Sequence, residues 1–267
     1  MYRIIKTDDG TETLFRDDLQ EAMHSTSGAY EEALLKHVLP SRILEKNKGH
    51  VRALDVGFGI GYNALALIAE HAERDPGIRL SIVSLERDLS CSTLIKKIRF
   101  GDERDRYYEI VKEACLNGEY TSDSVSMRVI FGDARNTVRQ LGGCFDAVFH
   151  DPYSPSKNPE LWTVDFFREL YRLTCRGSVV TTYSSAARVR RAFYEAGFMI
   201  GRGPSVGKKK EGTLASNRGD IPVFSDAERE RILALESSVP YRDPGLADTA
   251  ECIIQRRELD MKSAGVK

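Results

Sequence analysis

The sequence predicts a doubly wound α/β fold, built on a mostly parallel sheet of seven strands. Short apolar runs rich in β-branched residues alternate with longer stretches of helical periodicity, which is typical of parallel βαβ units. A glycine-rich turn at Asp55–Gly61 follows the first strand of this alternation and opens a helix, as at the ligand-binding edge of such sheets. We expect the sheet within residues 51–217, an N-terminal extension over residues 1–50, and a C-terminal appendage over residues 218–267.

The seven strands are expected where short apolar runs are bounded by turn residues. They lie at Arg52–Val56, Leu80–Glu86, Met127–Phe131, Phe145–His150 and Ser178–Tyr183, and in a closing hairpin made by Phe198–Gly201 and Gly212–Ala215. Helices are expected near Ala29–Leu39, Tyr62–His71, Leu89–Phe100, Glu160–Thr174, Ala186–Ala196 and Ser225–Ser237. Pro40 is expected to end the first helix. Residues 101–125 fit the alternation poorly and predict an inserted helix or a lid.

Composition and charge exclude several classes of protein. Of the 267 residues, 41% are hydrophobic and 30% are charged, which is typical of a globular protein. No apolar run approaches the roughly 18 residues of a membrane span, and the N-terminus lacks the apolar stretch of a signal peptide. We therefore expect a cytoplasmic protein with no membrane contact. The net charge of −1 argues against a surface that binds nucleic acid as a whole.

The cysteines give no sign of a metal or redox motif. The five of them, at positions 91, 115, 144, 175 and 252, are too far apart in sequence for a Cys-x-x-Cys site. We expect reduced thiols that pack as small apolar groups, and we expect no metal site.

The glycine-rich turn reads Asp-Val-Gly-Phe-Gly-Ile-Gly, with glycines at positions 57, 59 and 61. A dinucleotide fingerprint would need a glycine at position 62, where Tyr62 stands. The spacing instead favours S-adenosylmethionine (SAM), whose zwitterionic amino-acid end carries no phosphate and needs close contact with the backbone. Asp55 can attract the α-ammonium group of SAM through water. We therefore expect Asp55, Gly57, Gly59 and Gly61 to bind the cofactor.

Acidic residues also end the next two strands. Glu86 ends the second strand and can accept both ribose hydroxyls. The third strand ends in Gly132-Asp133-Ala134, where Asp133, with Ala134 beside it, can accept the adenine amino group. Acids at three successive strand ends predict a class I, Rossmann-like methyltransferase that depends on SAM. Two alternatives remain: the glycines form only a tight turn beside exposed strand-end acids, or the site binds NAD or FAD.

The fourth strand runs into His150-Asp151-Pro152-Tyr153, which is the predicted chemical site. Asp151 should face the ligand crevice, where a carboxylate can orient an amine and take up its proton. The Asp-Pro-Tyr sequence is close to the Asp/Asn-Pro-Pro-Tyr/Phe loop of methyltransferases that act on amino groups. Tyr153 is expected to stack on a base or to line the pocket. The alternative makes Asp151 a turn cap before proline, and strand alternation favours a packed His150 over a general base.

A basic segment spans residues 188–218, with eight basic residues against two acidic ones. This local charge of +6 leaves −7 on the rest of the chain, and it can steer a polyanion to one side of the molecule. The alternative is an ordinary solvated face. The candidate RNA-binding residues are Lys157, after the chemical site, and Arg188, Arg191, Lys208, Lys209 and Lys210.

Five segments together resemble the MnmC-like tRNA methyltransferases. The most specific is Phe145–Trp162, although Pro152 and Tyr153 depart from the Asp-Gly-Phe-x-Pro of the bifunctional members and resemble stand-alone ones. The glycine turn resembles the family's loop, including Asn63, which we add to the cofactor-binding residues. The remaining segments are Asp17–Val38, with His24, Ser25, Gly28 and Glu32, the basic stretch Gly207–Ser216, and Val239–Leu246 in the tail.

The resemblance implies a specific reaction. It implies methyl transfer from SAM to the exocyclic amine of 5-aminomethyluridine, or its 2-thio form, at the wobble position of the tRNA anticodon loop. It also implies a role for Asp151 at the amine, and roles for Gly57, Glu86 and Asp133 at SAM. Bifunctional relatives carry an FAD-dependent oxidase domain that this chain has no room for, so we expect another enzyme to make the aminomethyl group. The competing interpretations are a methyltransferase of another amine, an aminopropyl transferase, and an inactive SAM-binding module.

Overall fold

The computed structural model describes residues 2–23, 28–46, 48–74, 77–206 and 211–263. Its centre is a sheet of eight strands in the order β10-β11-β9-β8-β4-β5-β7-β6. The strands are β4 (His50–Val56), β5 (Arg79–Glu86), β6 (Glu119–Thr121), β7 (Val125–Phe131), β8 (Phe145–His150), β9 (Thr174–Thr182), β10 (Met199–Arg202) and β11 (Thr213–Ser216). The five inner strands, from β9 to β7, pair in parallel, whereas β6, β10 and β11 pair antiparallel. The predicted doubly wound, mostly parallel sheet is confirmed, but the count of seven strands was wrong.

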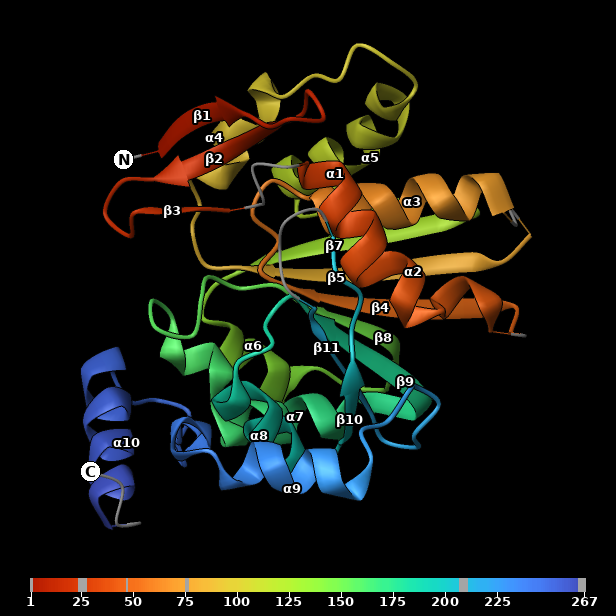
Figure 1. The fold of residues 1–267 in the computed structure, drawn as a ribbon. Coiled ribbons are helices and arrows are strands. Elements are labelled where there is room, and N and C mark those ends of the chain that lie inside the picture. Colours follow the sequence, from red (N-terminus) through yellow and green to blue (C-terminus); the bar gives the residue numbers. More distant parts are fainter. Residues whose placement is uncertain (1, 24–27, 47, 75–76, 207–210, 264–267) are drawn as a thin grey trace.

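Helices cover both faces of this sheet (Figure 1). They are α1 (Ala29–Glu32), a π-helical segment (Ala33–Val38), α2 (Leu39–Ser41), α3 (Tyr62–Arg74), α4 (Cys91–Leu94), α5 (Arg104–Asn117), α6 (Ala134–Gln140), α7 (Val164–Arg172), α8 (Ala187–Glu195), α9 (Asp226–Ala234) and α10 (Ala250–Ser263). Single 3₁₀ turns occur at Ile43–Glu45, Ile95–Lys97, Pro159–Trp162 and Glu236–Ser238. One core cluster packs α1, α3 and α5 on the sheet, and a second packs α6, α7 and α8 on the other face. The central strand β8 is buried throughout, as expected for a strand covered on both sides.

The first helix differs from its prediction in two respects. It runs through Pro40 and ends at Ser41, rather than ending before the proline. Its middle, Ala33–Val38, is a π-helix, in which backbone hydrogen bonds join residues five apart instead of four. The regular helical bonds that a proline would break are therefore already replaced just before Pro40. This irregular turn is buried and carries His37 into the centre of the molecule.

The segment over residues 101–125 is a helix and an edge strand rather than a lid. Helix α5 packs beside α3, and β6 pairs antiparallel with β7, which makes β6 the eighth strand of the sheet. The buried Tyr108 hydroxyl donates to the carbonyl of Ile60 at 2.7 Å. A Cβ on Gly61 would lie 2.5 Å from Val111 Cγ1, so α5 packs directly against the glycine-rich turn. The segment therefore supports that turn from one side.

Two cysteines that were expected to be reduced thiols form a disulfide. Cys144 and Cys175 lie just before Phe145 and just after Thr174, which pair between β8 and β9, and their Cα atoms are 4.9 Å apart. The prediction was wrong for this pair because strand pairing brings together residues 31 positions apart, which spacing along the chain does not reveal. Cys91, Cys115 and Cys252 are free.

A small second sheet precedes the main one and was not predicted. It consists of β1 (Tyr2–Lys6), β2 (Glu12–Arg16) and β3 (Glu21–Ala22), all antiparallel. The Tyr2 hydroxyl donates to Asp88 at 2.7 Å, and the Tyr62 hydroxyl donates to the carbonyl of Glu12 at 2.6 Å. These bonds dock the small sheet near the carboxyl edge of the main one, beside α4 (Figure 1).

The tail after β11 packs against α6 and α7 through one buried carboxylate. Asp243 is 0% exposed and accepts a hydrogen bond from Arg135 of α6 at 2.8 Å. Its backbone N–H donates to Asp165 of α7 at 2.8 Å. The division of the chain into three parts stays a prediction, but this network joins the tail to the main sheet's helices.

We expect Asp243→Ala to lower the free energy of unfolding by about 3 kcal/mol, because it leaves the guanidinium of Arg135 without one of its buried partners. Urea denaturation measures this change. Asp248→Ala is the matched control, since Asp248 pairs with Arg256 where both side chains are about one-third exposed (35% and 36%). That exposed pair should contribute less than about 1 kcal/mol. Equal effects of the two substitutions would show that Asp243 has no special structural role.

Among the described residues, no helix has the length and apolar character needed to cross a membrane. Within the same ranges, no group of three or more His, Cys, Asp or Glu side chains is placed to hold a metal ion.

Candidate active site

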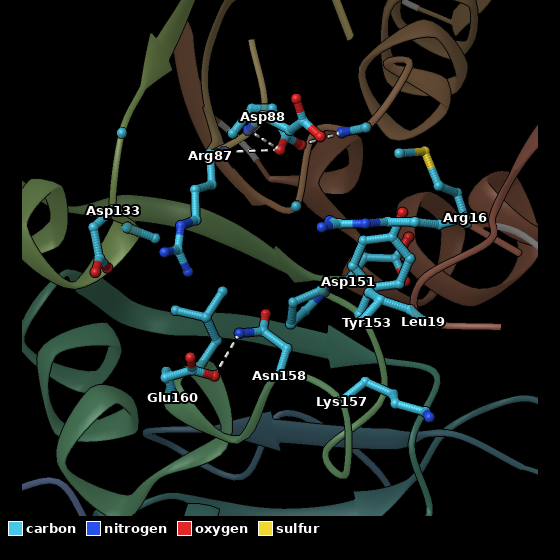
Figure 2. Close-up of a pocket in the computed structure, with 18 of the residues that line it drawn as sticks. Arg16, Leu19, Arg87, Asp88, Asp133, Asp151, Tyr153, Lys157, Asn158 and Glu160 are labelled. Carbon is cyan, nitrogen blue, oxygen red and sulfur yellow. Dashed lines mark hydrogen bonds between the residues drawn. The ribbon is translucent and has the colours of Figure 1, made fainter. Parts of the chain in front are cut away.

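A cavity of about 500 Å³ opens at the carboxyl ends of the central strands (Figure 2). Gly57 follows β4, Glu86 ends β5, Gly132 follows β7 and Asp151 follows β8, and all four residues line the cavity. The chain turns from β4 to β5 on one side, while β8 pairs with β4 on the other. The cavity therefore lies at the switch point of the sheet, where ligands bind in doubly wound folds.

The first two glycines of the turn line this cavity. Gly57 has φ +94°, and a Cβ there would lie 2.6 Å from the backbone oxygen of Asp151. Gly59 has φ +56°, and its N–H donates to Glu86 at 2.8 Å. Gly61 does not line the cavity, because it faces Val111 of α5. The turn thus brings its backbone against both the β5 acid and the β8 loop.

Glu86 is held in place by backbone amides. One carboxylate oxygen accepts from Gly59, and the other accepts from Arg87 at 2.7 Å and Asp88 at 2.8 Å. Burial raises the pKa of Glu86, although the three amide bonds oppose this shift. The side chain lines the cavity in a fixed orientation, as an acceptor for two neighbouring hydroxyls requires.

Asp133 lines the cavity and caps α6. Its carboxylate accepts the backbone N–H of Arg135 at 3.0 Å and pairs with the guanidinium of Arg135 at 2.8 Å. Burial disfavours the carboxylate, but the bonds and charge of Arg135 outweigh it and lower the pKa of Asp133. Gly132 and Ala134 line the cavity on either side, and a Cβ on Gly132 would enter open space.

These residues fit SAM. Glycine backbone, the carboxylate of Glu86 and the carboxylate of Asp133 follow one another around the cavity, at the positions expected for the amino-acid, ribose and adenine parts. Gly59 and Gly132 leave free the space that Cβ atoms would otherwise take. A cavity of about 500 Å³ is also of the size that holds a cofactor.

Asp55 and Asn63 do not line the cavity but lie beneath it. Asp55 is 0% exposed and accepts hydrogen bonds from Ser84 at 3.0 Å and Asn63 at 3.2 Å. Burial raises the pKa of Asp55 to about 7, against these hydrogen bonds. The amide of Asn63 also donates to Asp151 at 3.1 Å. Asp55 thus acts on the cavity wall through Asn63, and its expected attraction for the α-ammonium group stays a prediction.

Asp151 lines the cavity directly after β8. Its backbone N–H donates to the carbonyl of Val56 at 2.9 Å, and its carboxylate is 13% exposed. The loop that follows is fixed by two bonds to its backbone oxygens: Tyr183 donates to Pro152 at 3.0 Å, and Trp162 donates to Tyr153 at 2.8 Å. Because the backbone on both sides of Asp151 is fixed, its carboxylate presents its oxygens to a ligand in one orientation.

Tyr153 also lines the cavity, as predicted for a residue that lines the pocket. Its hydroxyl is buried without a hydrogen bond of good geometry among the described residues, and burial raises its pKa. The guanidinium of Arg16 lies 5.6 Å from the centre of its ring (Figure 2). The hydroxyl is turned away from solvent, so the ring is the part of Tyr153 that a ligand can meet.

His150 points to the opposite face of the sheet, as strand alternation predicts. Its ring lies 4.6 Å from that of Trp162 and 5.1 Å from that of Phe167, and neither nitrogen makes a hydrogen bond of good geometry among the described residues. Burial lowers the pKa of His150 to about 3. The residue is a neutral part of the aromatic core.

Comparisons with known proteins agree with this geometry. A family model described as S-adenosyl-L-methionine-dependent methyltransferase matches residues 100–218. The crystal structure of MnmC2 from Aquifex aeolicus has a TM-score of 0.89 and 34% identity, and the match covers 98% of this chain and 86% of that one. The chain belongs to the MnmC-like methyltransferase family. It is therefore an enzyme that uses SAM as methyl donor.

Two further relatives of this MnmC-like methyltransferase have different lengths. An uncharacterized protein of Methanocaldococcus jannaschii is 36% identical over 260 residues, which are 96% of this chain and 71% of that protein. The tRNA 5-methylaminomethyl-2-thiouridine biosynthesis bifunctional protein MnmC of Pseudomonas fluorescens is 35% identical over 168 residues, which are 59% of this chain. The match spans only 25% of the bifunctional protein's length.

Sequence reasoning missed one wall of this MnmC-like site. Arg16, Leu19 and Met23, from the small N-terminal sheet and the segments around it, line the cavity. Glu21 accepts hydrogen bonds from Ser154 at 2.8 Å and 3.2 Å, which tie this sheet to the loop after Asp151. One signal was available, since the Asp9-Gly10 dipeptide between two short apolar runs is typical of a hairpin.

The predicted RNA-binding residues are dispersed. Lys157 lines the mouth of the cavity, whereas Arg188 and Arg191 of α8 do not line it. Arg191 pairs with Glu195 at 2.7 Å, and Arg188 lies 5.6 Å from the ring centre of Tyr241. Lys208, Lys209 and Lys210 lie outside the described residues, as do His24 and Ser25. A cation that was not predicted, Arg87, extends toward the space between Asp133 and Asn158 (Figure 2).

Proposed function

We propose that this MnmC-like methyltransferase methylates the exocyclic amine of 5-aminomethyluridine, or of its 2-thio form, at the wobble position of tRNA. The products are then 5-methylaminomethyluridine, or its 2-thio form, and S-adenosylhomocysteine. The observation that carries the proposal is the carboxylate of Asp151, which Asn63 contacts at 3.1 Å and which faces a cavity that fits SAM. The similarity to the tRNA 5-methylaminomethyl-2-thiouridine biosynthesis protein MnmC, 35% identical over 59% of this chain, supports the tRNA substrate.

The residues around Asp151 suit a nitrogen acceptor. Bound SAM would supply an electrophilic methyl group: the methyl carbon would take the lone pair of a neutral amine, and the C–S bond would break to leave S-adenosylhomocysteine. Asp151 takes a proton from the ammonium form of the amine and accepts its remaining N–H, which aims the lone pair at the methyl carbon. The fixed loop of Pro152 and Tyr153 keeps the carboxylate in place, and the Tyr153 ring stacks on the uracil ring of the extruded base.

Cations at the mouth of the cavity suit a polyanion. Arg87 and Lys157 are exposed and line the cavity, and neither side chain has an ion pair among the described residues. Arg16 is paired with Asp18 at 3.0 Å. Two cations that line the same cavity as Asp151 suit the phosphates that flank a wobble nucleotide.

The deciding experiment is a methylation assay with radiolabelled SAM. The substrate is bulk tRNA from cells blocked in the methylation step, followed by nucleoside analysis. Label in 5-methylaminomethyluridine, with or without the 2-thio group, supports reaction and substrate together. SAM binding without any label in tRNA contradicts the tRNA substrate and directs the search to other amines.

We expect the double variant Arg87→Glu and Lys157→Glu to raise the KM for tRNA by at least about tenfold at low salt, because it replaces two phosphate contacts by repulsion. The kcat at saturating tRNA and saturating SAM should change much less. Arg79→Glu is the matched control, since exposed Arg79 begins β5 at the opposite edge of the sheet. A KM that is unchanged by the double variant, or equally raised by the control, argues against RNA binding at the cavity mouth.

A further inference from the structure

A buried histidine from outside the strand-end motifs lies against Asp151. His37 is 0% exposed and belongs to the π-helical segment Ala33–Val38. Its Nε2 atom lies 3.6 Å from one carboxylate oxygen of Asp151. Its Nδ1 atom lies 2.9 Å from the hydroxyl of Thr181 on β9. The imidazole therefore bridges a core hydroxyl and the carboxylate that faces the cavity.

The other carboxylate oxygen of Asp151 accepts a hydrogen bond from a different side chain. Asn63 of α3 donates to it at 3.1 Å, and the same amide nitrogen donates to Asp55 at 3.2 Å. Ser84 of β5 fixes Asp55 in turn, at 3.0 Å. The two oxygens of Asp151 are thus approached by side chains from two different helical segments, one on each side.

Chemistry favours one tautomer of His37. An ionised carboxylate only accepts hydrogen bonds, so the nitrogen beside Asp151 is best matched when it carries the proton. Nδ1 is then the acceptor, and the Thr181 hydroxyl can donate to it. Nε2 has no hydrogen bond with any described residue, so the nearby Asp151 is the partner that the geometry offers it. The distance of 3.6 Å is longer than a hydrogen bond, as is common before a substrate is bound.

We propose that His37 is a positioning residue for methyl transfer. Thr181 orients the ring, so that its Nε2–H faces one carboxylate oxygen of Asp151 while Asn63 donates to the other oxygen. Together the two side chains fix the orientation of the carboxylate. No proton passes through His37, because the ring is sealed from solvent and ends on a hydroxyl that serves as donor. This inference rests on the proposed function, since it assigns His37 to the carboxylate that orients the amine.

The first test is a spectroscopic measurement without tRNA. In protein labelled with ¹⁵N-histidine, His37 is assigned by the signals that His37→Asn removes. We expect the neutral tautomer with the proton on Nε2, and we expect Asp151→Asn to shift its Nε2 resonance. Asp133→Asn is the control and should leave that resonance in place. A proton on Nδ1 would overturn the proposal, and so would an Nε2 resonance that Asp151→Asn leaves unchanged.

The second test compares two substitutions of His37. Asparagine places its amide near the position of Nδ1 and keeps a polar partner for Thr181, whereas glutamine also reaches the position of Nε2 and keeps a donor toward Asp151. We expect His37→Asn to lower kcat by about 10- to 100-fold, with the SAM dissociation constant changed less than about threefold. The kcat of His37→Gln should be at least about tenfold higher than that of His37→Asn.

The outcomes separate this inference from the proposed function. Equal losses in His37→Asn and His37→Gln, with unchanged thermal unfolding, make His37 a packing residue and overturn the positioning role. A wild-type enzyme that labels no tRNA, while Asp151→Asn still shifts the His37 resonance, contradicts the proposed function and leaves the contact between the two side chains intact.

Discussion

Replacing Asp151 by Asn is expected to lower kcat for methylation by about 10²- to 10⁴-fold, while the SAM dissociation constant changes less than about threefold. Asparagine keeps the shape of the side chain and a carbonyl oxygen, but it cannot accept the proton of an ammonium group. The reacting amine then stays protonated and has no lone pair to donate. Single-turnover kinetics with aminomethyl-bearing tRNA and calorimetric titration with SAM measure the two quantities separately.

Glu160→Gln provides the matched control for this prediction. Glu160 is another acid that lines the cavity, and its carboxylate accepts a hydrogen bond from Asn158 at 2.9 Å. Its neutralisation should leave kcat within about threefold. If Asp151→Asn weakens SAM binding as much as it slows the reaction, Asp151 is a cofactor-binding or structural residue instead.

Gly57→Ala is expected to lower kcat/KM by more than about 10²-fold, because it disturbs both ligand sites together. The backbone there has φ +94°, which costs a non-glycine residue about 1–3 kcal/mol. The added Cβ would also lie 2.6 Å from the backbone oxygen of Asp151, so the loop after β8 has to move. Steady-state kinetics and urea denaturation of the same variant show how far function and stability fall.

Gly118→Ala isolates the backbone cost from the steric one. Gly118 follows α5 with φ +88°, close to the value at Gly57, but a Cβ there meets nothing within 4 Å. It should lose a similar amount of conformational stability and keep its activity at temperatures where the protein is folded. Loss of activity in proportion to stability in both variants would contradict a steric effect on Asp151.

Much of the main sheet was predictable because its signals are local. The strand Phe145–His150 was predicted with its observed bounds, since a short and mostly apolar run between turn residues favours a strand in a βαβ alternation. The residues that end β5, β7 and β8 were expected at one edge, and the structure places Glu86, Asp133 and Asp151 around one cavity. Their roles toward SAM and the amine stay predictions.

The parts that could not be predicted depend on contacts between distant residues. His37 lies 114 positions before Asp151, and only the buried π-helix brings it there, so its sequence neighbourhood resembles any apolar helix. Asp243 and Arg135 are 108 positions apart. Asp55 was expected at the cofactor, but the serine and asparagine that bury it come from the next strand and helix. Side-chain direction at such positions follows from packing, which periodicity does not report.

The bond between Asp243 and Arg135 has a consequence for synthesis on the ribosome. The ribosome completes the last strand of the main sheet, β11, at Ser216, well before it adds Asp243. A nascent chain can therefore pair all eight strands while Arg135 still lacks its second carboxylate. The helix that Asp133 caps gains its full set of partners only when this late segment emerges. A product of interrupted translation would thus carry the sheet without the full set of contacts that hold Arg135 beside Asp133 at the cavity wall.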